Sequence, residues 1–71
     1  MNKEILPFAI FMINRMAAKY GVSPSVMYHK LKSANCLEKY IIPHYDVLHT
    51  QGEDYLIKDI ANYLKNRGVL L

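Results

Sequence analysis

Apolar residues recur at helical spacing from the start of the chain, and they form two adjoining rows. One row is Ile5, Phe8, Ala9, Met12, Met16 and Tyr20, and the other is Leu6, Ile10, Ile13 and Ala17. This spacing predicts a helix with a very wide apolar face. Pro7 fits the first turn, and Gly21 can adopt the left-handed conformation that ends a helix. We expect a central helix packed on two sides, with a homodimer contact as the alternative use of the excess apolar surface.

Two short helices are predicted in the middle of the chain. Ser23 and Pro24 form a strong helix start, because the serine oxygen can accept a bond from a free amide and proline has no amide to satisfy. That helix should stop around residues 33–35. A second short helix, with apolar positions at Leu37, Tyr40 and Ile41, should be closed by Pro43.

The last helix is predicted from its ends as well as its apolar stripe. Thr50 and Glu53 have the T-x-x-E spacing of a capping box, and Gly68 is expected to stop the helix. The apolar positions between them are Leu56, Ile57, Ile60, Ala61, Tyr63 and Leu64. The apolar tail at residues 69–71 should fold back on the core or dock on a neighbour.

No alternating strand pattern, internal repeat or linker interrupts these segments. We therefore expect an all-α fold, in which residues 1–71 form a small single-domain bundle of four to five helices with a helix-turn-helix-like pair. A chain of 71 residues has a thin core and often gains stability from a partner. An interaction surface is expected on these physical grounds.

Composition indicates the type of protein and the cellular compartment that it fits. The chain is 52% hydrophobic and 21% charged, as expected for a folded domain, and its net charge of +3 is mild and dispersed. The single cysteine, Cys36, excludes an internal disulfide and fits a reducing cytoplasm. The apolar run at residues 5–13 is too short to span a bilayer. We expect a cytoplasmic protein with no membrane partner.

Few residues are arranged for catalysis or for holding a cofactor. The three glycines stand apart, so no Gly-rich phosphate loop is present. The histidines and Cys36 lack the spacing that clamps zinc. Asp46 and His49 could meet on one helical turn, which is a weak hint of acid–base chemistry. We expect no enzymatic activity, no cofactor and no metal.

A helix-turn-helix DNA-binding protein is the main alternative. The run MAAKYGVSPSVMYHKLKS has small residues, a glycine turn and a capped second helix, in the outline of that motif. The DNA-binding residues would be Ser25, Tyr28, His29, Lys30 and Lys32. This second helix carries no arginine or glutamine for base edges, so nucleic acid is a partner in this alternative alone.

The stretch HYDVLHTQGEDY, residues 44–55, is the most distinctive part of the chain. It contains a tyrosine-aspartate pair, a leucine-histidine-threonine run and a glutamine ahead of the last helix. With these residues the chain resembles the bacterial family known as domain of unknown function 3791. The residues that carry the resemblance are Tyr45, Asp46, Leu48, His49, Thr50 and Gln51.

The resemblance implies no assigned activity. It implies a neighbour instead, because members are often encoded beside a family that looks like ADP-ribosyltransferases, as a toxin and its small neutralising partner would be. Our leading hypothesis is a protein–protein interaction module, antitoxin-like or an accessory partner of a neighbouring gene product. Its most specific surface would be Tyr45, Asp46, His49, Thr50 and Gln51, with a homodimer contact through the first helix.

Overall fold

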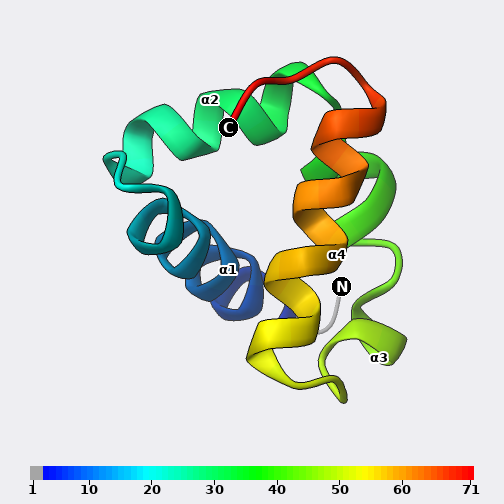
Figure 1. The fold of residues 1–71 in the computed structure, drawn as a ribbon. Helices are drawn as coiled ribbons and strands as arrows, with labels where there is room; N and C mark the ends of the chain where they lie inside the picture. The colour runs from blue at the N-terminus through cyan, green and yellow to red at the C-terminus, as the bar shows by residue number, and fades with distance from the viewer. Residues whose placement is uncertain (1–2) are drawn as a thin grey trace.

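The computed structural model describes residues 3–71 as five helices, joined by short turns. In chain order these are α1 (Ile5–Tyr20), α2 (Pro24–Ser33), η1 (Leu37–Ile41), α3 (Tyr45–Leu48) and α4 (Glu53–Asn66) (Figure 1). No strand occurs in this part of the chain. The predicted all-α bundle of four to five helices is confirmed.

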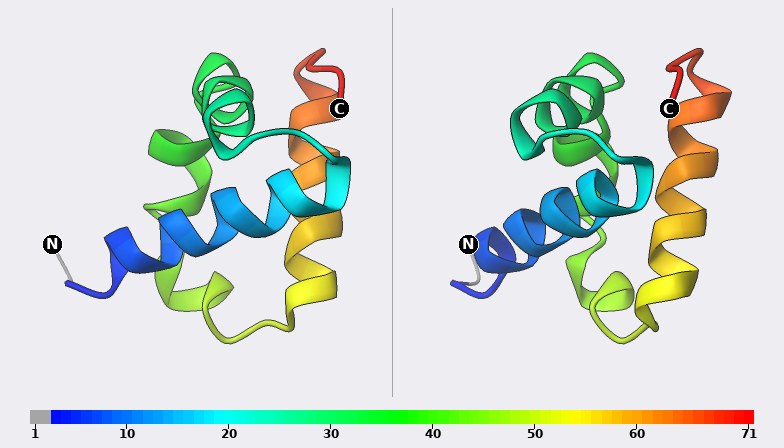
Figure 2. Two further views of the ribbon diagram at one scale, coloured as in Figure 1. Left: turned by 90° about the vertical axis from the view of Figure 1, so that its left-hand side faces the viewer. Right: turned by 60° about the vertical axis from the view of Figure 1, so that its left-hand side comes forward.

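The three long helices run in different directions. Figures 1 and 2 show α2 lying across one end of α1, while α4 crosses α1 on another side. Helix α1 contacts both α2 and α4, and α2 also contacts η1. The first helix is therefore packed on two sides, as its wide apolar face predicted.

The core is built from methionine and branched aliphatic side chains. Its fully buried members come from α1, α2, the turn after α2, η1 and α4, and they are Met12, Met16, Met27, Leu31, Cys36, Ile41, Ile60 and Leu64. The described chain buries no polar or charged residue. Methionine fills irregular gaps between helices well, because its side chain is unbranched and flexible. Helices that cross at different angles leave such gaps.

The turn between α1 and α2 follows the local chemistry predicted for it. Gly21 ends α1 in the left-handed region, with φ 66°, and its amide donates to the carbonyl of Ala17. The Ser23 hydroxyl accepts a hydrogen bond from the Val26 amide at 3.1 Å, and Pro24 is the first residue of α2. Both predicted helix ends are confirmed.

Helix η1 differs from the ordinary short helix that the pattern predicts. It is a π-helix, in which the Ile42 amide donates to the Leu37 carbonyl at 2.9 Å, five residues back. The left-handed Asn35, with φ 56°, separates it from α2. Pro43 follows in the turn before α3, so the predicted position of the break is correct.

The end of α4 is closed by backbone bonds around a glycine. Gly68 is left-handed, with φ 77°, and its amide donates to the Lys65 carbonyl. The next amide, of Val69, donates to Leu64, which completes a Schellman motif. Val69 packs on the core, and the Lys30 ammonium holds the Leu70 carbonyl at 2.7 Å. The tail therefore folds back over α2, although the Leu70 side chain stays exposed.

The predicted capping box at the start of α4 is wrong. The helix begins at Glu53 behind Gly52, and no side chain caps it. Thr50 instead belongs to the turn that closes α3, where its hydroxyl donates to the Val47 carbonyl at 2.7 Å. The Glu53 carboxylate accepts a bond from Arg15 of α1 at 2.7 Å. Both side chains therefore have partners other than the end amides of α4.

None of the helices within residues 3–71 is at once long enough and apolar enough to cross a membrane.

Candidate functional site: the α3–α4 joint

The predicted partner surface lies at the α3–α4 joint, which we define as residues 45–52. Three aromatic rings stack through it from α1 outward. The Phe8 ring meets Tyr45 edge to face at 5.4 Å between ring centres, and the Tyr45 ring lies parallel to His49 at 4.4 Å. This stack fixes the short helix α3 to the first half of α1.

His49 is held by its own helix as well as by the stack. Its Nδ1 lies 2.7 Å from the carbonyl oxygen of Tyr45, which also accepts the His49 backbone amide. A nitrogen at this distance from a carbonyl must carry the proton and donate it. The remaining ring nitrogen, Nε2, is therefore the acceptor of the neutral ring, and the His49 residue is exposed.

The five predicted partner residues are placed unequally. Tyr45 is only 9% exposed, so its side chain packs beneath the surface of the joint and offers little area to a partner. The Thr50 hydroxyl is bound to a backbone carbonyl. Asp46 and Gln51 are exposed, and within residues 3–71 no hydrogen bond or ion pair is formed by either side chain. The accessible polar groups of the joint are therefore those of Asp46, His49 and Gln51.

Asp46 and His49 do not form the contact that would suggest acid–base chemistry. Within residues 3–71 no hydrogen bond or ion pair joins the two side chains, and Nδ1 of His49 is bound to the Tyr45 carbonyl. In the described part of the chain, no group of three or more His, Cys, Asp and Glu side chains is placed to hold a metal ion.

Exposed apolar residues of α1 lie on two sides of the helix, and one of these sides borders the joint. Phe8, Phe11 and Arg15 lie on one side of the helix, at spacings of three and four residues. Phe8 contacts α3 and Arg15 bonds to α4, so Phe11 between them lies beside the joint. Phe11 is 44% exposed. Leu6 and Ile10, which are 63% and 50% exposed, lie on the opposite side of the helix from Phe8, because each residue turns the helix by about 100°. The sequence pattern identified this excess apolar surface correctly, but not its division between two sides of α1.

The residues of the DNA-binding alternative are mostly exposed. Ser25, Tyr28, His29 and Lys32 lie at helical spacing on the outer side of α2, and no helix covers them. The Lys32 ammonium lies 6.0 Å from the centre of the Tyr28 ring. Lys30 differs, because it is half-buried and donates to the Leu70 carbonyl. This lysine is committed to holding the C-terminal tail.

Sequence reasoning missed a polar and aromatic cluster between η1 and α4. The Tyr40 hydroxyl donates to the Asp59 carboxylate, and the Tyr40 ring stacks on Tyr63 at 4.8 Å. The Arg67 guanidinium also lies over the Tyr63 ring, 4.2 Å from the ring centre. The four-residue spacing of Asp59, Tyr63 and Arg67 on α4 was the available signal. The cluster ties η1 to α4.

The pKa values of Tyr40 and Cys36, both near this cluster, are raised, which keeps the hydroxyl and the thiol protonated. Burial, followed by the hydrogen bond to Asp59, raises the pKa of Tyr40. Burial also raises the pKa of the Cys36 thiol to about 12, against a smaller opposing effect of Arg67. A thiol of this kind is unreactive near neutral pH, because the thiolate is the nucleophilic form. Cys36 is therefore a core residue.

Comparison with known proteins identifies a family and nothing further. No curated protein and no solved structure matches the chain. A family model does match, over residues 7–67, and this range covers all but the first two residues of α1, then α2 to α4 with the whole α3–α4 joint. The chain therefore belongs to the family described as Protein of unknown function (DUF3791).

Proposed function

We propose that this chain is a small cytoplasmic protein–protein interaction module, which binds another protein through the α3–α4 joint. One observation carries the proposal. A rigid joint presents three accessible polar side chains, Asp46, His49 and Gln51, beside the exposed aromatic ring of Phe11. Aromatic anchors surrounded by hydrogen-bonding groups are typical of protein interfaces.

The joint is also preorganised. The stack of Phe8, Tyr45 and His49 fixes its backbone before any partner arrives. Preorganisation lowers the entropy cost of binding, because fewer side chains have to be ordered in the complex. This supports an antitoxin-like or accessory role, in which a small chain binds the product of a neighbouring gene, such as the ADP-ribosyltransferase-like proteins that the family resemblance implied.

A second copy of the chain is the proposed occupant of the outer face of α1. Leu6 and Ile10 are adjacent on this face at a spacing of four residues, and both are at least half exposed. A face of one helix can pair with itself around a two-fold axis, which is the commonest symmetry of soluble dimers. Light scattering coupled to size exclusion would detect the dimer, and Ile10→Ser should dissociate it. The matched control is Val26→Ser on α2, since Val26 is 44% exposed outside this face.

The partner surface is tested with charge-matched variants. Asp46→Ala and Gln51→Ala should each weaken capture of the protein encoded by the neighbouring gene, by roughly 1 kcal/mol or more if they lie at the centre of the interface. Glu38→Ala is the control, because Glu38 is an exposed carboxylate on η1, outside the joint. Unchanged binding in both joint variants, with correctly folded protein, would reject the joint as the partner surface.

The DNA-binding alternative is supported by the open outer face of α2, with Tyr28, His29 and Lys32 exposed. It makes a separate prediction, namely binding to duplex DNA that weakens steeply as salt rises, because phosphates release counterions. Lys32→Glu should abolish the binding. A low-salt titration with mixed genomic fragments that gives no complex would reject this alternative.

A further inference from the structure

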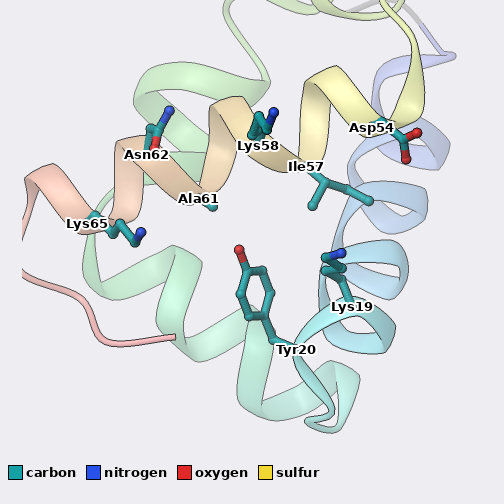
Figure 3. Close-up of a pocket in the computed structure, with 8 residues that line it drawn as sticks. All are labelled: Lys19, Tyr20, Asp54, Ile57, Lys58, Ala61, Asn62 and Lys65. Carbon is teal, nitrogen blue, oxygen red and sulfur yellow. The ribbon is translucent and has the colours of Figure 1, made fainter.

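A groove lies between the C-terminal end of α1 and the length of α4, on a different side of α4 from the Tyr40 cluster. Its volume is about 470 Å³, and two of its lining residues come from α1 and six from α4. Figure 3 shows Tyr20 pointing from the end of α1 toward α4, with Ile57 and Ala61 on the side of α4 that faces it. The groove is thus a hollow between two well-packed helices.

The floor of the groove is apolar. Ile57 and Ala61 of α4 are core residues that also line the groove. The half-buried Tyr20 ring forms the opposite wall. Side chains of this kind favour an apolar group of a ligand over water. A ligand that fits the groove therefore carries at least one apolar side chain.

The rim of the groove is basic. Lys19 rises from α1, and Lys58 and Lys65 rise from α4, while Asp54 is the one acidic residue of the lining. Three lysines and one aspartate give the lining a formal charge of +2. All three lysines are exposed. The concentration of cations at this groove contrasts with the dispersed charge of the chain as a whole.

The dimensions of the rim indicate an elongated ligand. Asp54, Lys58, Ala61 and Lys65 follow one stripe of α4, which extends for about 16 Å at 1.5 Å per residue. Lys58 and Lys65 are about 10 Å apart along the axis by the same rise. Side chains on one face of an extended peptide recur every two residues, or about 6.6 Å, so acidic side chains four positions apart, with an apolar one midway between them, could reach both flexible lysines.

We propose that this groove binds an acidic segment of a protein partner. Carboxylates of the segment pair with Lys19, Lys58 and Lys65, and an apolar side chain between them packs on Ile57 and Ala61. Asp54 repels carboxylates at one end of the groove, which fixes the direction in which the segment lies. The proposal deepens the proposed function and rests on it in one respect, namely that the partner is a protein. The groove is a second binding surface, separate from the joint.

Phosphate ligands fit the groove less well than carboxylates. Its lining has no arginine, the side chain that grips phosphate with two parallel hydrogen bonds. Neither does it contain a Gly-rich loop with converging backbone amides. The apolar floor also has no role in binding a nucleic-acid backbone. An acidic and apolar peptide uses both the lysines of the rim and the apolar floor.

The ¹⁵N-labelled protein is titrated with a short synthetic peptide that carries glutamates four positions apart and a leucine midway between each pair, and binding is monitored by amide chemical shifts. The expected result is saturable shifts in α4 and at the end of α1. Combined Lys58→Gln and Lys65→Gln should weaken binding on the order of tenfold, since each exposed ion pair contributes up to about 1 kcal/mol. Lys39→Gln, which removes an exposed lysine of η1, should leave the affinity unchanged.

Several outcomes would overturn the proposal. One is the absence of shifts at the groove, and another is equal binding of a matched peptide with glutamine in place of glutamate. Equal loss in the Lys39→Gln control, or stronger shifts with inorganic pyrophosphate or duplex DNA, would also reject it. Asp46→Ala and Gln51→Ala should not alter peptide binding, so a failure of the groove is distinguished from a failure of the joint.

Discussion

The imidazole of His49 lies nearly parallel to the ring of Tyr45, with the ring planes 9° apart and the ring centres separated by 4.4 Å. The same imidazole bonds to the Tyr45 carbonyl. His49 therefore has a structural role in holding α3, whatever its exposed edge contacts. Asp46 and Gln51 carry no such role, which makes them the cleaner probes of the partner surface.

Replacement of His49 by alanine should lower the free energy of unfolding by about 1–2 kcal/mol. The loss combines a ring stack and one hydrogen bond to the backbone, each worth roughly 0.5–1.5 kcal/mol and partly exposed to water here. Urea denaturation followed by circular dichroism measures the change. His29→Ala is the control, because His29 is exposed and bonds to no carbonyl. Equal effects of the two substitutions would contradict the structural role of His49.

Removal of the Tyr40 hydroxyl tests the tie between η1 and α4. Tyr40→Phe keeps the stack on Tyr63 and leaves the Asp59 carboxylate without its donor. We expect a loss of about 1.5–3 kcal/mol, as for other hydrogen bonds to charged groups. Tyr55→Phe is the matched control, since the Tyr55 side chain is 57% exposed. If Tyr40→Phe were as mild as that control, the cluster would have no stabilising role.

Sequence reasoning succeeded where the determinants are local. Gly21, Ser23 and Pro24 act on residues within one helical turn, so both ends of the α1–α2 turn could be predicted. The capping box failed because its two side chains had better partners elsewhere. The partner of Glu53 is Arg15, 38 residues away in sequence, and spacing alone carries no information about such a contact.

The candidate site, like the fold, could be predicted from the sequence only in its local features. The pattern identified the joint, although Tyr45 of the predicted partner surface is buried. It could not predict that Phe11 lies beside the joint, or that Lys19 of α1 and Lys65 of α4 line the same groove. Both depend on the angles at which α1 crosses its neighbours. These angles follow from packing of the whole core, which no single segment determines.

The glycine that ends α1 should not tolerate a side chain. Gly21→Ala places a Cβ in the left-handed region at φ 66°, and we expect a loss of about 1–2 kcal/mol in a thermal or urea melt. Space is not the cause, because no atom lies within 4 Å of the added Cβ. Gly52→Ala is the control, since Gly52 has an ordinary φ of −70° and the same open surroundings. This control should lose less, about 0.5 kcal/mol, because Gly52 is the N-cap of α4 and alanine caps a helix less well than glycine. An equally large loss at both glycines would rule out backbone strain at Gly21.

The stability of the protein should fall in alkaline solution because of Cys36. Burial raises the pKa of its thiol from 9.0 to about 12, so above pH 9 the unfolded chain releases this proton while the folded chain retains it. The folded state then binds more protons than the unfolded state, and the free energy of unfolding decreases as pH rises. Between pH 9 and the folded pKa the slope approaches about 1.4 kcal/mol per pH unit.

The measurement is a series of urea denaturations between about pH 8 and 9.5, a range that lies below most of the titration of tyrosines in the unfolded chain. Cys36→Ala should be less stable at neutral pH, because it leaves a cavity in the core, yet its stability should depend less on pH. The difference between the two slopes isolates the thiol from all other groups that titrate in this range. Parallel slopes for the two proteins would mean that Cys36 ionises equally well in the folded and unfolded chains.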